Sequence, residues 1–170
     1  AGTTRLRARP VALSDWIIAG ASIVAVVAAL TWVAKRSDLG EEATLLAIGA
    51  GLLYGLQDAL TQRTLDRLDA GLGDLLTSWE PYALLLVAIV GLELAQTAFE
   101  AAPLPASLPA ITIAEPLCGI GLGAGLFGQH IRLGPLYLAA ELVCLVMMVL
   151  GVLLLARSPV VTGHETAGRT

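Results

Sequence analysis

Carboxylic acids inside long apolar runs are the residues of this chain best suited to chemistry. Glu115 and Pro116 stand near the middle of LPASLPAITIAEPLCGIGLGAGLFG, which runs from Leu104 to Gly128. As a helix this run would span about 37 Å, enough to cross a hydrocarbon core of about 30 Å. An acid at that depth costs about 2.5–3.5 kcal/mol. Because Pro116 has no N–H, the carbonyl of Thr112 loses its helical partner beside the acid. We therefore expect a polar site that faces an interior and not lipid.

The other acids in apolar runs differ in their expected depth. Glu93 and Gln96 are three residues apart and share a helix face. Asp58 lies toward the end of its run, and Glu141 lies about two turns into the last one. Glu80 stands near the start of a run, and we interpret it as a solvated acid at the membrane interface. The candidates for a substrate path are therefore Glu115, Pro116, Thr112, Glu93, Gln96, Asp58 and Glu141.

The composition indicates an integral membrane protein. The chain is 56% hydrophobic and 14% charged, with a mean hydropathy of +0.80, far from the balance of a soluble domain. All ten basic residues fall in the chain ends and the connections between apolar runs. The net charge of −4 includes no basic stripe, which argues against a nucleic-acid partner. We expect a multi-pass protein of the cell membrane with the lipid bilayer as a partner.

Five apolar runs predict an all-α membrane protein, a bundle of five transmembrane helices. Ser14 and Asp15 can cap the first helix, and a charged turn at 35–42 separates it from the second. We expect residues 62–74 to form an amphipathic connection at the interface. The bundle would occupy residues 14–157, between a polar segment at 1–13 and a disordered tail at 158–170. The predicted runs cover about residues 16–34, 43–61, 75–99, 104–128 and 133–156.

Glycines at a spacing of four predict close helix packing. Gly51 and Gly55 form one such pair, and the run after Pro116 holds two overlapping pairs. A glycine-rich helix interrupted by proline beside a buried acid is also typical of a moving or unwinding element in a transporter. The predicted packing glycines are Gly51, Gly55, Gly119, Gly121, Gly123 and Gly125.

The remaining reactive residues predict no catalytic or metal site. Cys118 and Cys144 both lie in apolar runs and are expected to be buried and unpaired. His130 lies in a connection, where a solvated loop residue is expected. No histidine cluster, Gly-x-Ser-x-Gly elbow or metal-ligand spacing is present, so we expect neither an enzyme nor a bound cofactor.

Residues 103–156 resemble the last two helices of the drug/metabolite transporter superfamily, the EamA-like domain. Glu115-Pro116 resembles a Glu-Pro pair of that family, and the segment from Gly151 to Leu155 resembles the end of its final helix. The chain departs from the family at the following turn, where Gln129 stands after Gly128 in place of the usual Glu. The segment GLLYGLQDALTQR at 51–63 is similar to the second helix of a family repeat.

The resemblance implies one five-helix repeat, the C-terminal one, of a ten-helix transporter with two inverted repeats and substrate bound between them. It implies a second five-helix repeat as a partner, in the same chain or in a dimer, and a cytoplasmic C-terminus. The charge bias of the connections, six basic residues against four, would instead place the N-terminus inside. That near-balance also leaves open a dual-topology antiparallel dimer of this unit.

Three interpretations follow for the function. The first is a secondary transporter, or half of one, that moves a small metabolite, a drug-like solute or a cation by alternating access, with proton coupling through Glu115. A divalent-cation transporter of the magnesium-transporting NIPA-like branch is close to it. The second, from another class, is a membrane subunit whose helices only pack against a partner. An intramembrane enzyme is the third, and it lacks any supporting motif.

Overall fold

The structure, a computed structural model, describes residues 11–102 and 104–127, and residues 143, 144, 146–148, 150, 151 and 154 of the last apolar run. Over this described part it is helical and contains no strand. The helices are α1 (Leu13–Ala34), α2 (Leu39–Ala70), α3 (Leu72–Thr77), α4 (Glu80–Ala101) and α5 (Leu104–Phe127).

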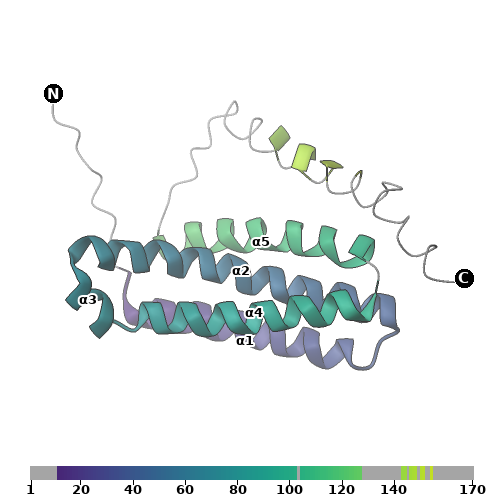
Figure 1. The fold of residues 1–170 in the computed structure, drawn as a ribbon, viewed down its shortest axis with the longest axis horizontal. Coiled ribbons are helices and arrows are strands. Elements are labelled where there is room, and N and C mark those ends of the chain that lie inside the picture. The colour runs from purple at the N-terminus through teal and green to yellow at the C-terminus, as the bar shows by residue number, and fades with distance from the viewer. Residues whose placement is uncertain are drawn as a thin grey trace, which may run out of the picture.

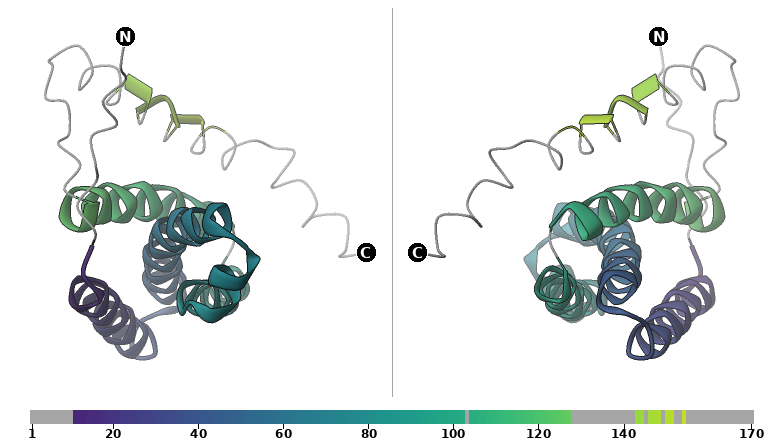
Figure 2. Two further views of the ribbon diagram at one scale, coloured as in Figure 1. Left: turned by 90° about the vertical axis from the view of Figure 1, so that its left-hand side faces the viewer. Right: turned by 90° about the vertical axis from the view of Figure 1, so that its right-hand side faces the viewer.

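Helix α2 is the centre of the arrangement. It packs against α1, α4 and α5, whereas α5 touches α1 and α4 only slightly (Figures 1 and 2). In the end views of Figure 2, α2 lies between α5 on one side and α1 and α4 on the other. Successive long helices run in opposite directions, so α2 and α5 are parallel (Figure 1). Most contacts between the long helices therefore involve α2.

Four of the described helices are long and apolar enough to cross a membrane. They are α1, α2, α4 and the part of α5 from Ser107 to Leu126. Within the most apolar stretches, most residues of α2 are buried, but few residues of α1 are. The outer faces of α1 and α4 carry exposed large aliphatic side chains, such as Ile18, Leu85 and Leu86. These are the properties of an integral membrane protein, in which lipid covers the outer faces.

Small residues let α2 approach its neighbours. Ala34, Ala47 and Ala98 are fully buried in one apolar cluster, which joins the end of α1 to α2, α4 and α5. A second cluster, around Trp16 and Leu60, fills the opposite end of the bundle. We call this second end the Arg67 end, after the arginine of α2 described below, and the first the Lys35 end.

Three predicted boundaries were wrong. Helix α1 begins at Leu13 with Ala12 at its N-cap, so Ser14 and Asp15 lie in its first turn and not at its cap. Helix α2 continues to Ala70 because residues 62–70 contain neither Gly nor Pro, and the predicted interfacial connection is therefore largely helical. The third run does not form one helix from Leu75, because the chain breaks at Ser78, which is extended.

The fourth predicted helix is observed as α5, which continues through Pro109 and Pro116. Unwinding at Pro116 was one interpretation of the sequence, and the described helix has no break there. The fifth predicted helix, the terminal segments at 1–10 and 155–170, Glu141 and His130 lie outside the described residues, apart from the eight positions given above. These eight are helical and exposed, among them Cys144, which the sequence had predicted to be buried.

Candidate functional site

The contact between α2 and α5 brings two backbones unusually close. A Cβ atom on Gly51 would lie 2.7 Å from the Ala114 Cβ and 2.8 Å from the Ile111 carbonyl oxygen. A Cβ atom on Gly55 would lie 2.6 Å from the Cys118 Cβ and 2.8 Å from the carbonyl oxygen of Glu115. All four distances are shorter than van der Waals contact, so only glycine fits at these two positions. Gly51 and Gly55 thereby set the position of Glu115 against α2.

Glu115 lies at this seam beside a second acid. Its side chain is half-buried, and its carbonyl oxygen lies against Gly55, about one helical turn before Asp58 on α2. Asp58 is three residues after Gly55 on α2, and its side chain is exposed in the described chain. Tyr54 of α2 also interacts electrostatically with Glu115. The tyrosine ring packs on the other side against α4, where a Cβ atom on Gly91 would lie 3.1 Å from the ring.

Cys118 completes the polar groups of the seam. Its thiol Sγ donates a hydrogen bond to the Leu52 carbonyl oxygen of α2 at 3.3 Å, and the same side chain interacts electrostatically with Asp58. It is half-buried and free, one of two free cysteines among the described residues. We call Tyr54, Asp58, Glu115 and Cys118 the seam cluster.

The two residues predicted to accompany Glu115 on its own helix lie within one turn of it. The Thr112 hydroxyl donates to the Leu108 carbonyl oxygen at 2.8 Å, within the helix, and its side chain is half-buried. Pro116 directly follows Glu115 and is also half-buried. The backbone at this level of α5 therefore has a proline, which donates no hydrogen bond, and a threonine that bonds back to an earlier turn.

Glu93 and Gln96 do not join the seam cluster. Helix α4 faces α2 through Gly91, Ala95 and Ala98, which are buried. Glu93 lies two residues from both Gly91 and Ala95, about 200° around the helix, and therefore points away from α2. Glu93 and Gln96 are exposed. Of the predicted path residues, Glu115, Pro116, Thr112 and Asp58 are thus brought together, whereas Glu93 and Gln96 lie on another face.

No basic side chain neutralises the seam cluster in the described part of the chain. The ion pairs found there both involve Arg67, which binds Asp74 and Glu80. Neither Glu115 nor Asp58 takes part in one. Among the described residues, no group of three or more His, Cys, Asp and Glu side chains is arranged to hold a metal ion.

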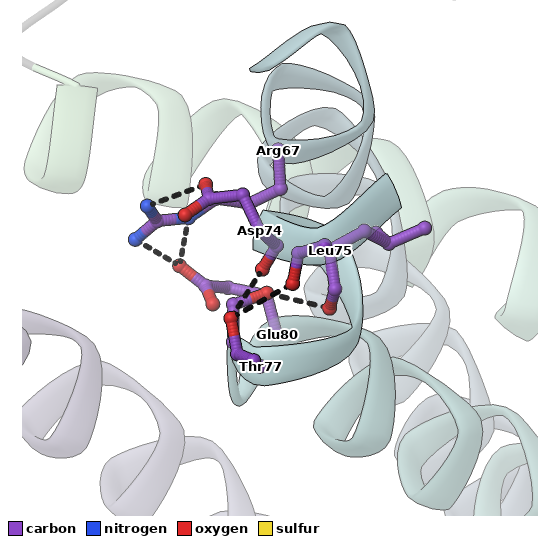
Figure 3. Close-up of polar contacts among 7 residues, drawn as sticks. Arg67, Asp74, Leu75, Thr77 and Glu80 are labelled. Carbon is purple, nitrogen blue, oxygen red and sulfur yellow. Dashed lines mark hydrogen bonds and ion pairs between the residues drawn. The ribbon is translucent and has the colours of Figure 1, made fainter. Parts of the chain in front are cut away.

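The sequence analysis misinterpreted Glu80, an acid outside the predicted substrate path. It was expected to be solvated, but its side chain is 1% exposed and it accepts hydrogen bonds from Arg67 through Oε1 (Figure 3). The contact arises because the chain turns back between the end of α2 and the start of α4. The glycine at 71, between the acid-base-rich end of α2 and Pro81, was a turn signal from which this proximity could have been inferred.

A shallow groove lies between the Arg67 ends of α1 and α5. Its volume is about 280 Å³, and it is lined by residues including Asp15, Ile18, Gly121 and Gly125. Gly121 and Gly125 have no atom within 4 Å of where a Cβ would lie. These glycines, unlike Gly51 and Gly55, have no packing partner among the described residues. Gly119 also has open space outside its Cα, and Gly123 is half-buried.

The chain is similar to an uncharacterized protein of Corynebacterium glutamicum, with 29% identity over 147 residues. The match covers 86% of this chain and 51% of that protein, so the chain spans about half the length of the relative. No family model matches the chain, and no solved structure matches it.

Proposed function

We propose that this chain is a secondary membrane transporter, or half of one, and that the seam cluster is part of its path for a cationic solute or proton. The observation that carries the proposal is the close contact of two membrane-length helices at Gly55, which places Glu115 of α5 within about one helical turn of Asp58 on α2. Two neighbouring carboxylates repel each other, and without a basic partner a proton or a cation relieves that repulsion. An anionic solute would increase it.

The surroundings of the pair support a transport path more than a purely structural role. A buried ionisable group retained for packing alone is costly in lipid, and an apolar residue would serve that purpose better. Glu115 is also held at a fixed place by the glycine contacts of α2. The relative is about twice as long as this chain, which leaves room in it for a second unit of similar size. We likewise propose, as the EamA-like resemblance implies, that this chain is one repeat of a two-repeat transporter.

The proposal is tested by flux through proteoliposomes that contain the full natural protein. We measure uptake of protons and of a panel of monovalent, divalent and organic cations, with Glu115→Gln and Asp58→Asn as variants. Either variant should lower the flux at least about tenfold, because each removes one charge of the pair; such a change corresponds to about 1.4 kcal/mol. Glu100→Gln, an exposed acid on α4, is the matched control and should leave the flux unchanged.

A membrane subunit that only packs against a partner is the second candidate, favoured by the open glycine face of α5 at Gly121 and Gly125. It predicts that the seam variants change assembly or thermal stability with no solute-specific flux in the wild type. If no cation is carried by the wild-type protein, or if Glu115→Gln transports normally, the transport path through the seam cluster is wrong.

A further inference from the structure

The Arg67 end of the bundle is joined by one guanidinium that serves two acids. Arg67, in the last turn of α2, donates to Oε1 of Glu80 from Nε at 3.2 Å and from Nη2 at 3.1 Å (Figure 3). Its Nη1 donates to Oδ2 of Asp74, on α3, at 3.3 Å. The contact to Glu80 connects α2 directly to the first residue of α4. Arg67 therefore binds both acids at once, through different nitrogen atoms.

The two acids are in unequal surroundings. Glu80 is buried, and its second oxygen, Oε2, has no hydrogen-bond partner in the described structure. Asp74 is 47% exposed, so water can hydrate it when it is unpaired. A half-satisfied buried carboxylate gains less from its ion pair than one with both oxygens bound. Transfer of Arg67 toward Asp74, with Glu80 neutralised or hydrated, is therefore a second available arrangement.

The segment between α2 and α4 is built to allow such a change. Gly71 has φ 131° and ψ 156°, a conformation that side-chain-bearing residues rarely adopt, and it separates α2 from α3. Helix α3 has no buried residue, and its Leu72 and Leu76 are exposed. The segment is therefore held by polar contacts and not by a buried apolar face: Asp74 binds Arg67, and the Tyr82 hydroxyl of α4 donates to the Leu76 carbonyl oxygen at 2.9 Å.

Below the ion pair, α2 and α4 meet through apolar side chains. Leu84 and Val87 of α4 pack on the cluster that contains Leu56 and Leu60 of α2. Apolar contacts of this kind can separate without breaking a hydrogen bond. Arg67 is nine residues beyond Asp58, which places the ion pair about 13 Å farther along α2. The pair therefore lies between the seam cluster and the Arg67 side of the membrane.

We propose that Arg67 and Glu80 form a releasable latch that holds α2 against α4 at the Arg67 end, and that Asp74 retains Arg67 once its bonds to Glu80 are released. With the latch closed, the apolar contacts between α2 and α4 at this end stay together. With Arg67 bonded to Asp74 alone, the Arg67 end opens between α2 and α4. This assignment rests on the proposed transport function, for which it supplies a gate on one side of the membrane.

The test measures how readily water reaches the contact between α2 and α4. A reporter cysteine is placed at Val87, in the full protein with Cys118→Ser and Cys144→Ser, and is labelled in proteoliposomes with a membrane-impermeant maleimide. Glu80→Gln should raise the labelling rate about tenfold, equivalent to about 1.4 kcal/mol in the opening equilibrium. Asp74→Asn should lower the rate, because it leaves Arg67 with Glu80 alone.

Two controls separate a latch from general loosening. A reporter at Ala98, buried at the Lys35 end, should show no increase with Glu80→Gln. Glu100→Gln, an exposed acid of α4, should leave the Val87 reporter unchanged. Asp74→Asn distinguishes a latch from a purely structural network even where Glu80→Gln fails to fold. A structural network would loosen, and label faster, when either acid is removed.

The latch is refuted if Asp74→Asn speeds labelling, or if a folded Glu80→Gln leaves it unchanged. Cation flux, measured on vesicles whose protein keeps its natural Cys118 and Cys144, tells the two proposals apart. Flux with unresponsive labelling would overturn the latch and leave the transport function. Labelling that responds as expected in a protein without flux would overturn the transport function and leave the latch as a conformational contact.

Discussion

Helix α2 is held to its two main partners in different ways. Against α5 it presents Gly51 and Gly55, and the opposing backbone comes so close that no side chain fits between. Against α4 it presents Tyr54 and, at one end, Arg67, which reach across to Gly91 and Glu80. The first contact has no slack, because backbone atoms cannot move aside. The second is made by side chains that have other rotamers and, for Arg67, another acceptor. The difference suggests that α2 and α5 move as one unit, while α4 can separate from them.

The largest expected effect comes from filling the close contact. Gly55→Ala places a methyl group 2.8 Å from the Glu115 carbonyl oxygen and 2.6 Å from the Cys118 Cβ, so the helices must separate. We expect the free energy of unfolding to fall by about 3 kcal/mol, at the upper end for overpacking. The measurement is the midpoint of thermal unfolding in detergent, which should be lower. The matched control is Gly20→Ala on α1, where no atom lies within 4 Å and the helix propensity of alanine is higher. Equal melting of the two variants would contradict the close contact.

Removing the positive charge of Arg67 from the α2–α4 contact should lower the free energy of unfolding by a smaller amount. Arg67→Gln leaves the buried carboxylate of Glu80 unpaired, and we expect a loss of about 2 kcal/mol, below the usual range for buried pairs because Arg67 is 37% exposed and water screens it. The double variant Arg67→Gln/Glu80→Gln should recover most of this loss, since no buried charge is left. Thermal unfolding of the three proteins measures the coupling. A double variant less stable than Arg67→Gln would show that the charge of Glu80 stabilises the fold by another route.

The smallest effect is expected from the glycine on the α4 side. Gly91→Ala places a methyl group 3.1 Å from the Tyr54 ring, which can tilt by a few tenths of an ångström. We expect a loss of about 1 kcal/mol or less, clearly smaller than for Gly55→Ala. If Gly91→Ala were as destabilising as Gly55→Ala, the two contacts would be equally rigid, and α4 would have no special freedom to move.

The seam cluster shows which neighbouring residues the sequence could predict and which it could not. Glu115, Pro116 and Thr112 stand together in the chain, so their proximity follows from one helix. Asp58 is 57 residues away, and its place beside Glu115 depends on the parallel packing of α2 and α5. Glu93 is also a carboxylic acid inside an apolar run, yet it lies on the face of α4 that points away from α2. Which acids meet was therefore not predictable from depth along the runs alone, because depth does not specify the rotation of a helix about its axis.

The break between α3 and α4 shows a similar limit. The sequence analysis treated Leu75 to Phe99 as one run, although the stretch from Thr77 to Pro81 interrupts its apolar residues. The observed chain turns at Ser78, beside which Trp79 packs edge-to-face on Trp16, with ring centroids 5.9 Å apart, and Glu80 reaches Arg67. Gly71 and Pro81 were local signals of a turn, but the ring contact joins residues far apart in sequence and leaves no local signal.

The amino-acid sequence by itself determined that the described chain is helical, that its helices suit a membrane, and that Glu115 stands inside an apolar run, because helix length and transfer free energy depend on local composition. The tertiary structure decided which acids are neighbours, which glycines pack backbone to backbone, and that Glu80 is buried with Arg67. Those features depend on how the helices are rotated and paired about α2, and that arrangement results from the fit of all contacts at once.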